Sequence, residues 1–306
     1  MPLRCNQALP IRARLPHGVR AKRAKRAKRN VKSLQGLIQC ANTPKATPMP
    51  RLTLAFAFAV LAFTGAARAA EHPLIQHIDP PEQDFFAKSL DYHGIPIKAP
   101  AVVVDEALFE AYDRLEQLLA HQPVAVKNLA AAGAELHIIG RDQVTTDLPE
   151  WRHDKGKKLT EYNGLTRDER TRGMGGRLTS CGEENLLRLE TDRYRGRDIC
   201  IHEFAHNVRN QGIQRELRQK FDDQYKASLA RGLWQRSYAG SNPDEFFAEL
   251  TMWYFGTHGD LSMTGPKPAN GPDGLKAYDP DAYALFDDFY QGRLEVTTVE
   301  PRQRRR

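Results

Sequence analysis

Two histidines and a glutamate have the types and the spacing of a metal centre, in the run His202-Glu203-Phe204-Ala205-His206. Residues four apart lie on one face of an α-helix, so His202 and His206 can present two imidazole nitrogens to the same point. Glu203 is beside them, where its carboxylate can take a proton from a water held by the metal. Zn2+ suits this set because it accepts nitrogen and carboxylate ligands in a tetrahedron, and a catalytic zinc keeps the fourth position for water.

The competing interpretation of this motif is a helix with two surface histidines. Its flanking residues argue against that interpretation, because they are apolar and predict a buried helix. They are Ile199, Ile201, Phe204 and Val208. Imidazoles buried without a partner would cost free energy, so the metal centre is favoured.

A catalytic zinc needs a third protein ligand, and the extended H-E-x-x-H-x-x-G-x-x-H pattern is absent. The next candidates are Glu245 and Glu249. Asn242 before Pro243 predicts a helix start, which puts both glutamates on one face, one turn apart. Glu245 could instead complete a capping box with Asn242, and Glu249 could be a surface carboxylate. Two glutamates on one face favour one as the ligand and the other as a hydrogen-bonding partner of a histidine.

The spacing of these motifs resembles a known family. The run His202–Val208 (HEFAHNV) is followed by Tyr238 and, seven residues later, by Glu245–Glu249 (EFFAE). This arrangement resembles the catalytic domain of anthrax lethal factor and its relatives, which include the bacterial Pro-Pro endopeptidases. Those proteins are gluzincin-type zinc endopeptidases. The resemblance covers about Asp192–Trp253, and the N-terminal third of the chain shows no such match.

The resemblance implies a role for each motif residue. It implies three zinc ligands, His202, His206 and Glu245. It also implies that Glu203 is the general base, that Tyr238 donates a hydrogen bond to the transition state, and that Glu249 supports a ligand histidine. The one departure is Ala205, where relatives commonly have glycine. The function expected is therefore a secreted zinc-dependent endopeptidase, and the alternative is a non-catalytic zinc-binding protein on the same zincin fold.

A polypeptide substrate is expected to bind as an extended strand beside an exposed sheet edge. Gly173–Thr179 (GMGGRLT) could supply such an edge, since glycines let another backbone approach closely. An ordinary turn is an equally good interpretation of these glycines.

The elements that must position the motif residues are few strands followed by several helices, which favours an α+β fold. We expect strands at Ala101–Val104 and Glu135–Ile139, and strand-like structure within Gly175–Leu189. Glu71–Pro100 is expected to be an extended lead-in, and Trp151–Asp168 a loop. Helices are expected over five segments: Asp105–Gln122, Asp198–Asn210, Gln214–Arg231, Pro243–Phe255 and Pro280–Tyr290. The resemblance adds a zincin-like domain, with a small mixed sheet packed on the motif helix and on the helix that carries the glutamates.

Charge is unevenly distributed along the chain. The first 69 residues contain 14 Lys and Arg and no Asp or Glu. The remainder has 31 basic against 38 acidic residues, so a formal net charge of +7 for the whole chain becomes −7. A basic domain that binds phosphates is therefore disfavoured, and we expect no nucleic-acid partner.

The segment from Met49 has the three parts of a secretory signal peptide. Met-Pro-Arg is a short positive start, Leu52–Phe63 is an apolar run, and Ala67-Arg68-Ala69 is a small-residue cleavage site. The apolar run is too short to span a bilayer comfortably, so we expect no stable membrane anchor. We therefore predict a basic extension over 1–48 outside the mature protein, a signal peptide over 49–69, and a single metallopeptidase domain over 70–306. The mature protein is expected to be a secreted or periplasmic monomer.

The cysteines agree with export. Cys181 and Cys200 are the only cysteines after residue 69. Two cysteines in an oxidising compartment pair more often than not, although two buried thiols are the alternative. We predict a disulfide between them, with Cα atoms about 4.4–6.8 Å apart.

Overall fold

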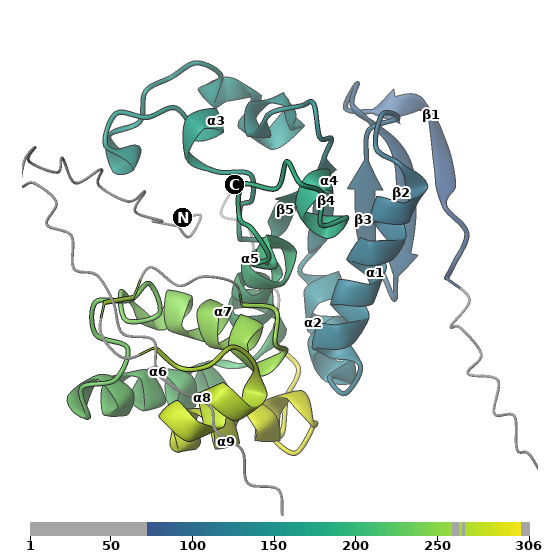
Figure 1. The fold of residues 1–306 in the computed structure, drawn as a ribbon. Helices are drawn as coiled ribbons and strands as arrows, with labels where there is room; N and C mark the ends of the chain where they lie inside the picture. The colour runs from purple at the N-terminus through teal and green to yellow at the C-terminus, as the bar shows by residue number, and fades with distance from the viewer. Residues whose placement is uncertain (1–71, 259–262, 265–266, 301–306) are drawn as a thin grey trace, which may run out of the picture. The chain divides into compact units, whose positions relative to one another are not determined.

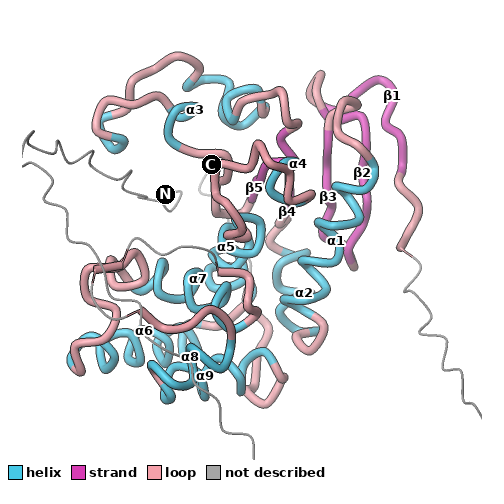
Figure 2. Tube along the Cα trace, in the orientation of Figure 1, coloured by secondary structure: helices cyan, strands magenta, loops and turns pink. Residues whose placement is uncertain are grey.

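The fold is α+β, as predicted, and contains one mixed sheet. The computed structural model describes residues 72–258, 263–264 and 267–300, so the extension and the signal peptide expected within 1–69 lie outside the described residues. The strands of the sheet are β1 (Gln76–Glu82), β2 (Phe86–Tyr92), β3 (Ile95–Ala99), β4 (Glu135–Ile139) and β5 (Leu178–Gly182). They lie side by side in chain order (Figure 2). Neighbours among β1–β3 are antiparallel, whereas β4 runs parallel to both β3 and β5.

The first three strands occupy Glu71–Pro100, so the expectation of an extended lead-in there is wrong. The signal that sequence reasoning missed is an alternation of apolar residues on β2 and β3. Four side chains at alternating positions are buried: Leu90, Tyr92, Ile95 and Ile97. The polar residues between them, and the largely exposed β1, hid this pattern.

The strand expected at Ala101–Val104 is also wrong, because β3 already ends at Ala99. The segment is a turn that leads into the first helix. Val103 is buried in this turn, but Val102 is 66% exposed. The Val103 N–H donates to Pro100 O at 3.2 Å, so the backbone closes a turn here and does not pair with a strand.

The helices agree with the sequence-based predictions more closely than the strands do. They are α1 (Asp105–Leu119), α2 (Pro123–Ala131), α3 (Arg167–Arg170), α4 (Glu183–Leu186), α5 (Ile199–Asn207), α6 (Arg215–Ala230), α7 (Pro243–Tyr254), α8 (Pro272–Tyr278) and α9 (Pro280–Tyr290). Five of them, α1, α5, α6, α7 and α9, form where predicted. Helix α5 ends at Asn207 because Val208–Gly212 forms a π-helical turn. The expected loop Trp151–Asp168 includes the short 3-10 helix Thr160–Tyr162.

The main hydrophobic core lies between one face of the sheet and the helices. Its members come from β2–β5 and from helices that include α1, α2, α5 and α7. Helix α5 packs against β5, α1 and α7, and Figure 1 shows it between the sheet and the group α6–α9. A smaller apolar cluster, Phe86, Ile139 and Leu148, lies apart from this core. Helix α5 is therefore enclosed on several sides, which fixes the direction of its side chains.

The predicted disulfide is confirmed. It joins Cys181 on β5 to Cys200 on α5, with Cα atoms 5.1 Å apart. The bond ties the motif helix directly to the last strand of the sheet. In the described part of the chain, we find no helix with the length and apolar character needed to cross a membrane.

Candidate metal centre

Helix α5 begins at a buried carboxylate that fixes its first turn. The Asp198 side chain accepts a hydrogen bond from the Ile201 backbone N–H at 3.0 Å, which satisfies one of the free donors at the helix start. The other oxygen of Asp198 accepts from Arg114 at 2.7 Å and from Arg188 at 2.6 Å. The disulfide at Cys200 lies in the same first turn. The cap and the disulfide together hold the start of the helix, so His202, which follows the first turn, has a defined direction.

The two motif histidines and Glu245 converge on one point. The Nε2 atoms of His202 and His206 are 3.3 Å apart. Glu245 Oε2 lies 3.2 Å from the first of these atoms and 3.5 Å from the second. A tetrahedral zinc with bonds of about 2.1 Å would separate its ligand atoms by about 3.4 Å. The three side chains thus have both the chemistry and the spacing that zinc requires.

Glu245 reaches this point from the first turn of α7. The Asn242 side chain accepts hydrogen bonds from the backbone N–H groups of Asp244 and Glu245, at 3.0 Å each. The Glu245 carboxylate itself faces the histidines, so it does not complete the capping box considered from the sequence. Burial acts to raise the pKa of Glu245, but the neighbouring His206 and His202 lower it to about 2. The group is therefore an anion at neutral pH, as a metal ligand must be.

Glu203 lies in the same buried cluster. One ligand-type atom from each of His202, Glu203 and His206 can be chosen so that all three lie within 4.8 Å of one another, and this group could hold a metal ion. The Glu245 oxygen, at 3.2 and 3.5 Å from the two Nε2 atoms, is a further candidate for the third ligand. If Glu245 is that ligand, Glu203 is left beside the metal position, where a carboxylate can exchange protons with a bound water.

The Gly173–Gly175 segment lies directly against Glu203. A Cβ at Gly175 would lie 3.1 Å from Glu203 Oε2 and 3.0 Å from His206 Cδ2, so only glycine lets the backbone come this near. Met174, between the two glycines, pairs antiparallel with Ser180 of β5 through N–O distances of 3.0 and 2.9 Å. The two glycines therefore let the segment pack closely on Glu203 and His206, and Gly176, with a φ of +119°, lies in the turn that leads back to β5.

Glu249 lies behind His202, one helical turn from Glu245. Its Oε1 is 3.3 Å from His202 Nδ1 and contacts Arg197, and its Oε2 is 3.1 Å from His258 Nε2. Burial acts to raise the pKa of Glu249, but Arg197 and the two histidines hold it well below its usual range. This ionised group can therefore orient His202 through the ring nitrogen that faces away from the metal position.

Sequence reasoning missed the residues that hold Glu249. His258 is a core histidine, stacked on Trp253 with ring centroids 3.7 Å apart. Arg197 belongs to no recognisable sequence motif. The pairs Arg197–Glu249 and His258–Glu249 span 52 and nine residues of the chain, and no spacing rule connects them.

Tyr238 lies in the connection between α6 and α7. Its ring centroid is 6.0 Å from that of His202, and the two ring planes are within 22° of parallel. The loop is anchored by Trp234, which is fully buried and donates from Nε1 to Asp279 at 2.8 Å. Another tyrosine near this loop, Tyr225 on α6, donates a hydrogen bond to Gly240 O at 3.0 Å and packs on Phe246. Of the two tyrosines, Tyr238 is the one that stacks on a motif histidine.

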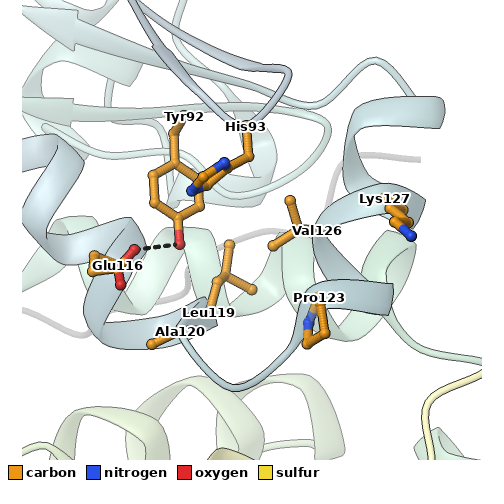
Figure 3. A pocket seen from close by; sticks show the side chains of 8 residues that line it. All are labelled: Tyr92, His93, Glu116, Leu119, Ala120, Pro123, Val126 and Lys127. Carbon is orange, nitrogen blue, oxygen red and sulfur yellow. Dashed lines mark hydrogen bonds between the residues drawn. The ribbon is translucent and has the colours of Figure 1, made fainter. Parts of the chain in front are cut away.

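A pocket of about 330 Å³ is a separate feature of the molecule (Figure 3). Leu119 and Val126 contribute apolar surface to it, and the Tyr92 hydroxyl donates to Glu116 at 3.0 Å on its wall. It is built from α1, α2 and the end of β2. None of its lining residues belongs to the histidine and glutamate cluster, so it is not part of the metal centre.

Comparison with known proteins gives a distant structural likeness. The sequence matches no protein-family model and no curated protein. Among solved structures, the fold is similar to that of a Pro-Pro endopeptidase from Paenibacillus alvei, with 19% sequence identity and a TM-score of 0.44. The match covers 61% of this chain and 92% of that chain. We therefore base the function on the geometry of the metal centre.

Proposed function

We propose that this chain is an exported zinc endopeptidase with a zincin-like domain, in which His202, His206 and Glu245 hold the metal. The observation that carries the proposal is the triangle of two Nε2 atoms and one Oε2 atom, whose sides of 3.2, 3.3 and 3.5 Å fit a tetrahedral zinc. Three protein ligands leave the fourth position to water or substrate. That open position is the mark of a catalytic zinc as opposed to a structural one.

The chemistry follows from the groups around this position. Zinc, when bound, supplies Lewis acidity that polarises the scissile carbonyl and brings the pKa of a water towards neutrality. Glu203 accepts the proton of that water and delivers it to the leaving amine, which cannot depart as an anion. Tyr238 donates a hydrogen bond to the oxyanion that develops on the carbonyl oxygen. Glu249 holds the His202 ring in place through Nδ1.

The substrate is proposed to bind as an extended polypeptide along Gly173–Gly175. Met174 directs its N–H and C=O to Ser180 of β5. Because successive residues of an extended segment face opposite sides, the N–H and C=O of Gly175 are proposed to face away from β5 and to pair with the peptide. Those of Gly173 are already bonded to the Thr171 hydroxyl. A peptide paired there would lie beside Glu203, within reach of the metal position.

Export is proposed from two features that agree. The first is the predicted signal peptide at 49–69, and the second is the Cys181–Cys200 disulfide, a bond that persists in oxidising compartments. The mature chain is proposed to act in the periplasm or outside the cell.

The experiment is a peptide-library cleavage assay on the purified chain from residue 70. We expect internal peptide bonds to be cut, activity to vanish with a chelator, and activity to return with one equivalent of Zn2+. Zinc binding without cleavage of any peptide would instead favour the non-catalytic zinc protein. Cleavage that survives complete removal of metal would contradict the proposal.

A further inference from the structure

The π-helical turn Val208–Gly212, directly after the motif helix, carries a buried arginine that the catalytic chemistry does not use. Arg209 is 6% exposed, and it lies three residues after His206. Guanidinium groups do not lose their charge in proteins, so a buried arginine requires carboxylates around it. The carboxylates that contact Arg209 therefore show which elements the turn is joined to.

Both partners are aspartates from other helices. Arg209 Nη1 lies 2.5 Å from Asp244 Oδ1 on α7, and Nη2 contacts Asp222 Oδ1 on α6. The side chains of Asp244 and Asp222 are 23% and 27% exposed, so the three groups form a largely enclosed ion cluster. We call these three residues the Arg209 bridge.

The bridge joins the two elements that carry the zinc ligands. On one side, Arg209 follows His206 by less than one turn. On the other side, Asp244 immediately precedes Glu245 in the first turn of α7. The contact between Arg209 and Asp244 therefore lies next to the pair His206 Nε2 and Glu245 Oε2, which are 3.5 Å apart, and holds the same two elements together.

The type of side chain matters in this position. A guanidinium is a rigid planar fork that can bind one carboxylate at each end, whereas an ammonium group is a single point of charge. Only arginine can hold Asp244 and Asp222 at fixed and separate positions.

We propose that the Arg209–Asp244 pair is a positioning device that sets the separation between the ligands His206 and Glu245, and so sets the zinc affinity. The inference rests on the proposed zinc site. Arg209 and Asp244 touch neither metal nor substrate in this account. Partners outside the ligand set typically change metal affinity by about 10- to 100-fold.

The test compares three matched variants by Zn2+ affinity, measured by competition with a chromophoric chelator. Asp244→Asn keeps the size of the side chain and removes its charge, and we expect it to weaken zinc binding by about 10-fold or more. Arg209→Lys should weaken it by less. Asp222 is on α6, which carries none of the proposed ligands. Asp222→Asn should therefore weaken zinc binding by no more than about threefold.

A control variant breaks a similar ion cluster elsewhere. Lys98 lies between Glu82 and Glu135 at 2.9 and 2.8 Å and is 9% exposed. Lys98→Met should lower the unfolding midpoint yet leave zinc affinity unchanged. The visible absorption of the Co2+-substituted protein gives a second readout, because it reports ligand geometry. It should shift in Asp244→Asn and stay constant in Lys98→Met.

The outcomes separate this inference from the proposed function. A wild-type chain that binds neither Zn2+ nor Co2+ would overturn both. Wild-type zinc binding with an unchanged affinity and Co2+ spectrum in Asp244→Asn would overturn this inference alone. Equal losses in Asp244→Asn and Asp222→Asn would also overturn it, because they would indicate general loosening of the helices.

Discussion

At the scale of single residues, Glu245 and Glu249 show how position on a helix separates two roles. They are one turn apart on α7, yet Glu245 faces two Nε2 atoms and Glu249 faces His202 Nδ1. The sequence could place both on one face but could not tell which would meet the histidines. That difference depends on where α7 crosses α5, and the crossing is fixed by packing among residues far apart in the chain.

Tyr238 is expected to contribute in the transition state, so Tyr238→Phe should lower kcat by about 10²-fold with little change in KM or zinc content. Steady-state kinetics on one cleaved peptide, together with metal analysis, measures this. Tyr225→Phe is the matched control, because its hydroxyl binds Gly240 O in the same loop without reaching the histidines. Full activity in Tyr238→Phe would show that the Tyr238 hydroxyl has no part in catalysis and that the side chain only packs.

Gly175→Ala tests the close approach of the sheet edge to the motif helix. The new Cβ would lie 3.1 Å from Glu203 Oε2, so the carboxylate or the backbone must shift. Because small displacements of a catalytic group are costly, we expect kcat/KM to fall by about 10-fold or more. Gly212→Ala, whose Cβ would lie at an ordinary 3.5 Å from Ala125, should retain activity. Equal activities for the two variants would contradict the proposed role of the segment.

The residues that the sequence did not reveal share one property. Arg197 and Arg209 act through partners 52 and 35 residues away, and neither lies in a recognisable motif. A buried arginine cannot be told from a solvated one by its neighbours in the sequence, because burial depends on which helix packs over it. The pair His202 and His206, in contrast, was predictable because two imidazoles that face one metal from a single helix must be four residues apart.

At the scale of elements, helices were easier to predict than strands. Helix α7 is marked by Asn242 and Pro243, and the structure confirms this start, with Asn242 as the capping residue. Strand β1, in contrast, is mostly polar and exposed, and it gains its stability by pairing with β2. The residues of such a strand do not predict it from the sequence, because the strand is held by hydrogen bonds to another segment of the chain.

The disulfide should stabilise the contact between β5 and α5. It closes a loop with a sequence separation of 19 residues, for which the chain-entropy model gives about 3 kcal/mol. We expect the double variant Cys181→Ala/Cys200→Ala to lose about this much unfolding free energy. Urea unfolding followed by circular dichroism measures it, with reductant added to the wild type as a second comparison. A loss near zero would show that the contact holds without the bond.

At the scale of the whole molecule, a second buried ionic cluster lies on the sheet, outside the metal centre. His137 on β4 is 1% exposed and lies 2.9 Å from Glu135 and 2.7 Å from Glu150. Lys98 also contacts Glu135, at 2.8 Å. Burial lowers the pKa of His137, but the hydrogen bonds to the two carboxylates outweigh it and raise the pKa above its ordinary value.

The raised pKa of His137 predicts the direction of a pH effect on stability. A histidine whose pKa is higher in the folded state contributes stability that is complete below its unfolded pKa of about 6.5, and this stability is lost as the pH rises through the folded value. The difference in unfolding free energy between wild type and His137→Gln should therefore shrink as the pH rises above about 6.5. Urea titrations at several pH values measure the difference, and a constant gap would show that the pKa of His137 is the same in the folded and unfolded states.

Glu203 is proposed to act as the proton carrier at a zinc held by other residues. The most direct measurement is the cleavage rate of Glu203→Gln at saturating peptide, with the zinc content of the same sample. We predict one zinc per chain, as in the wild type, and a rate lower by at least about 10³-fold, more than for Tyr238→Phe. A Glu203→Gln variant that holds zinc and cleaves at the wild-type rate would contradict the account.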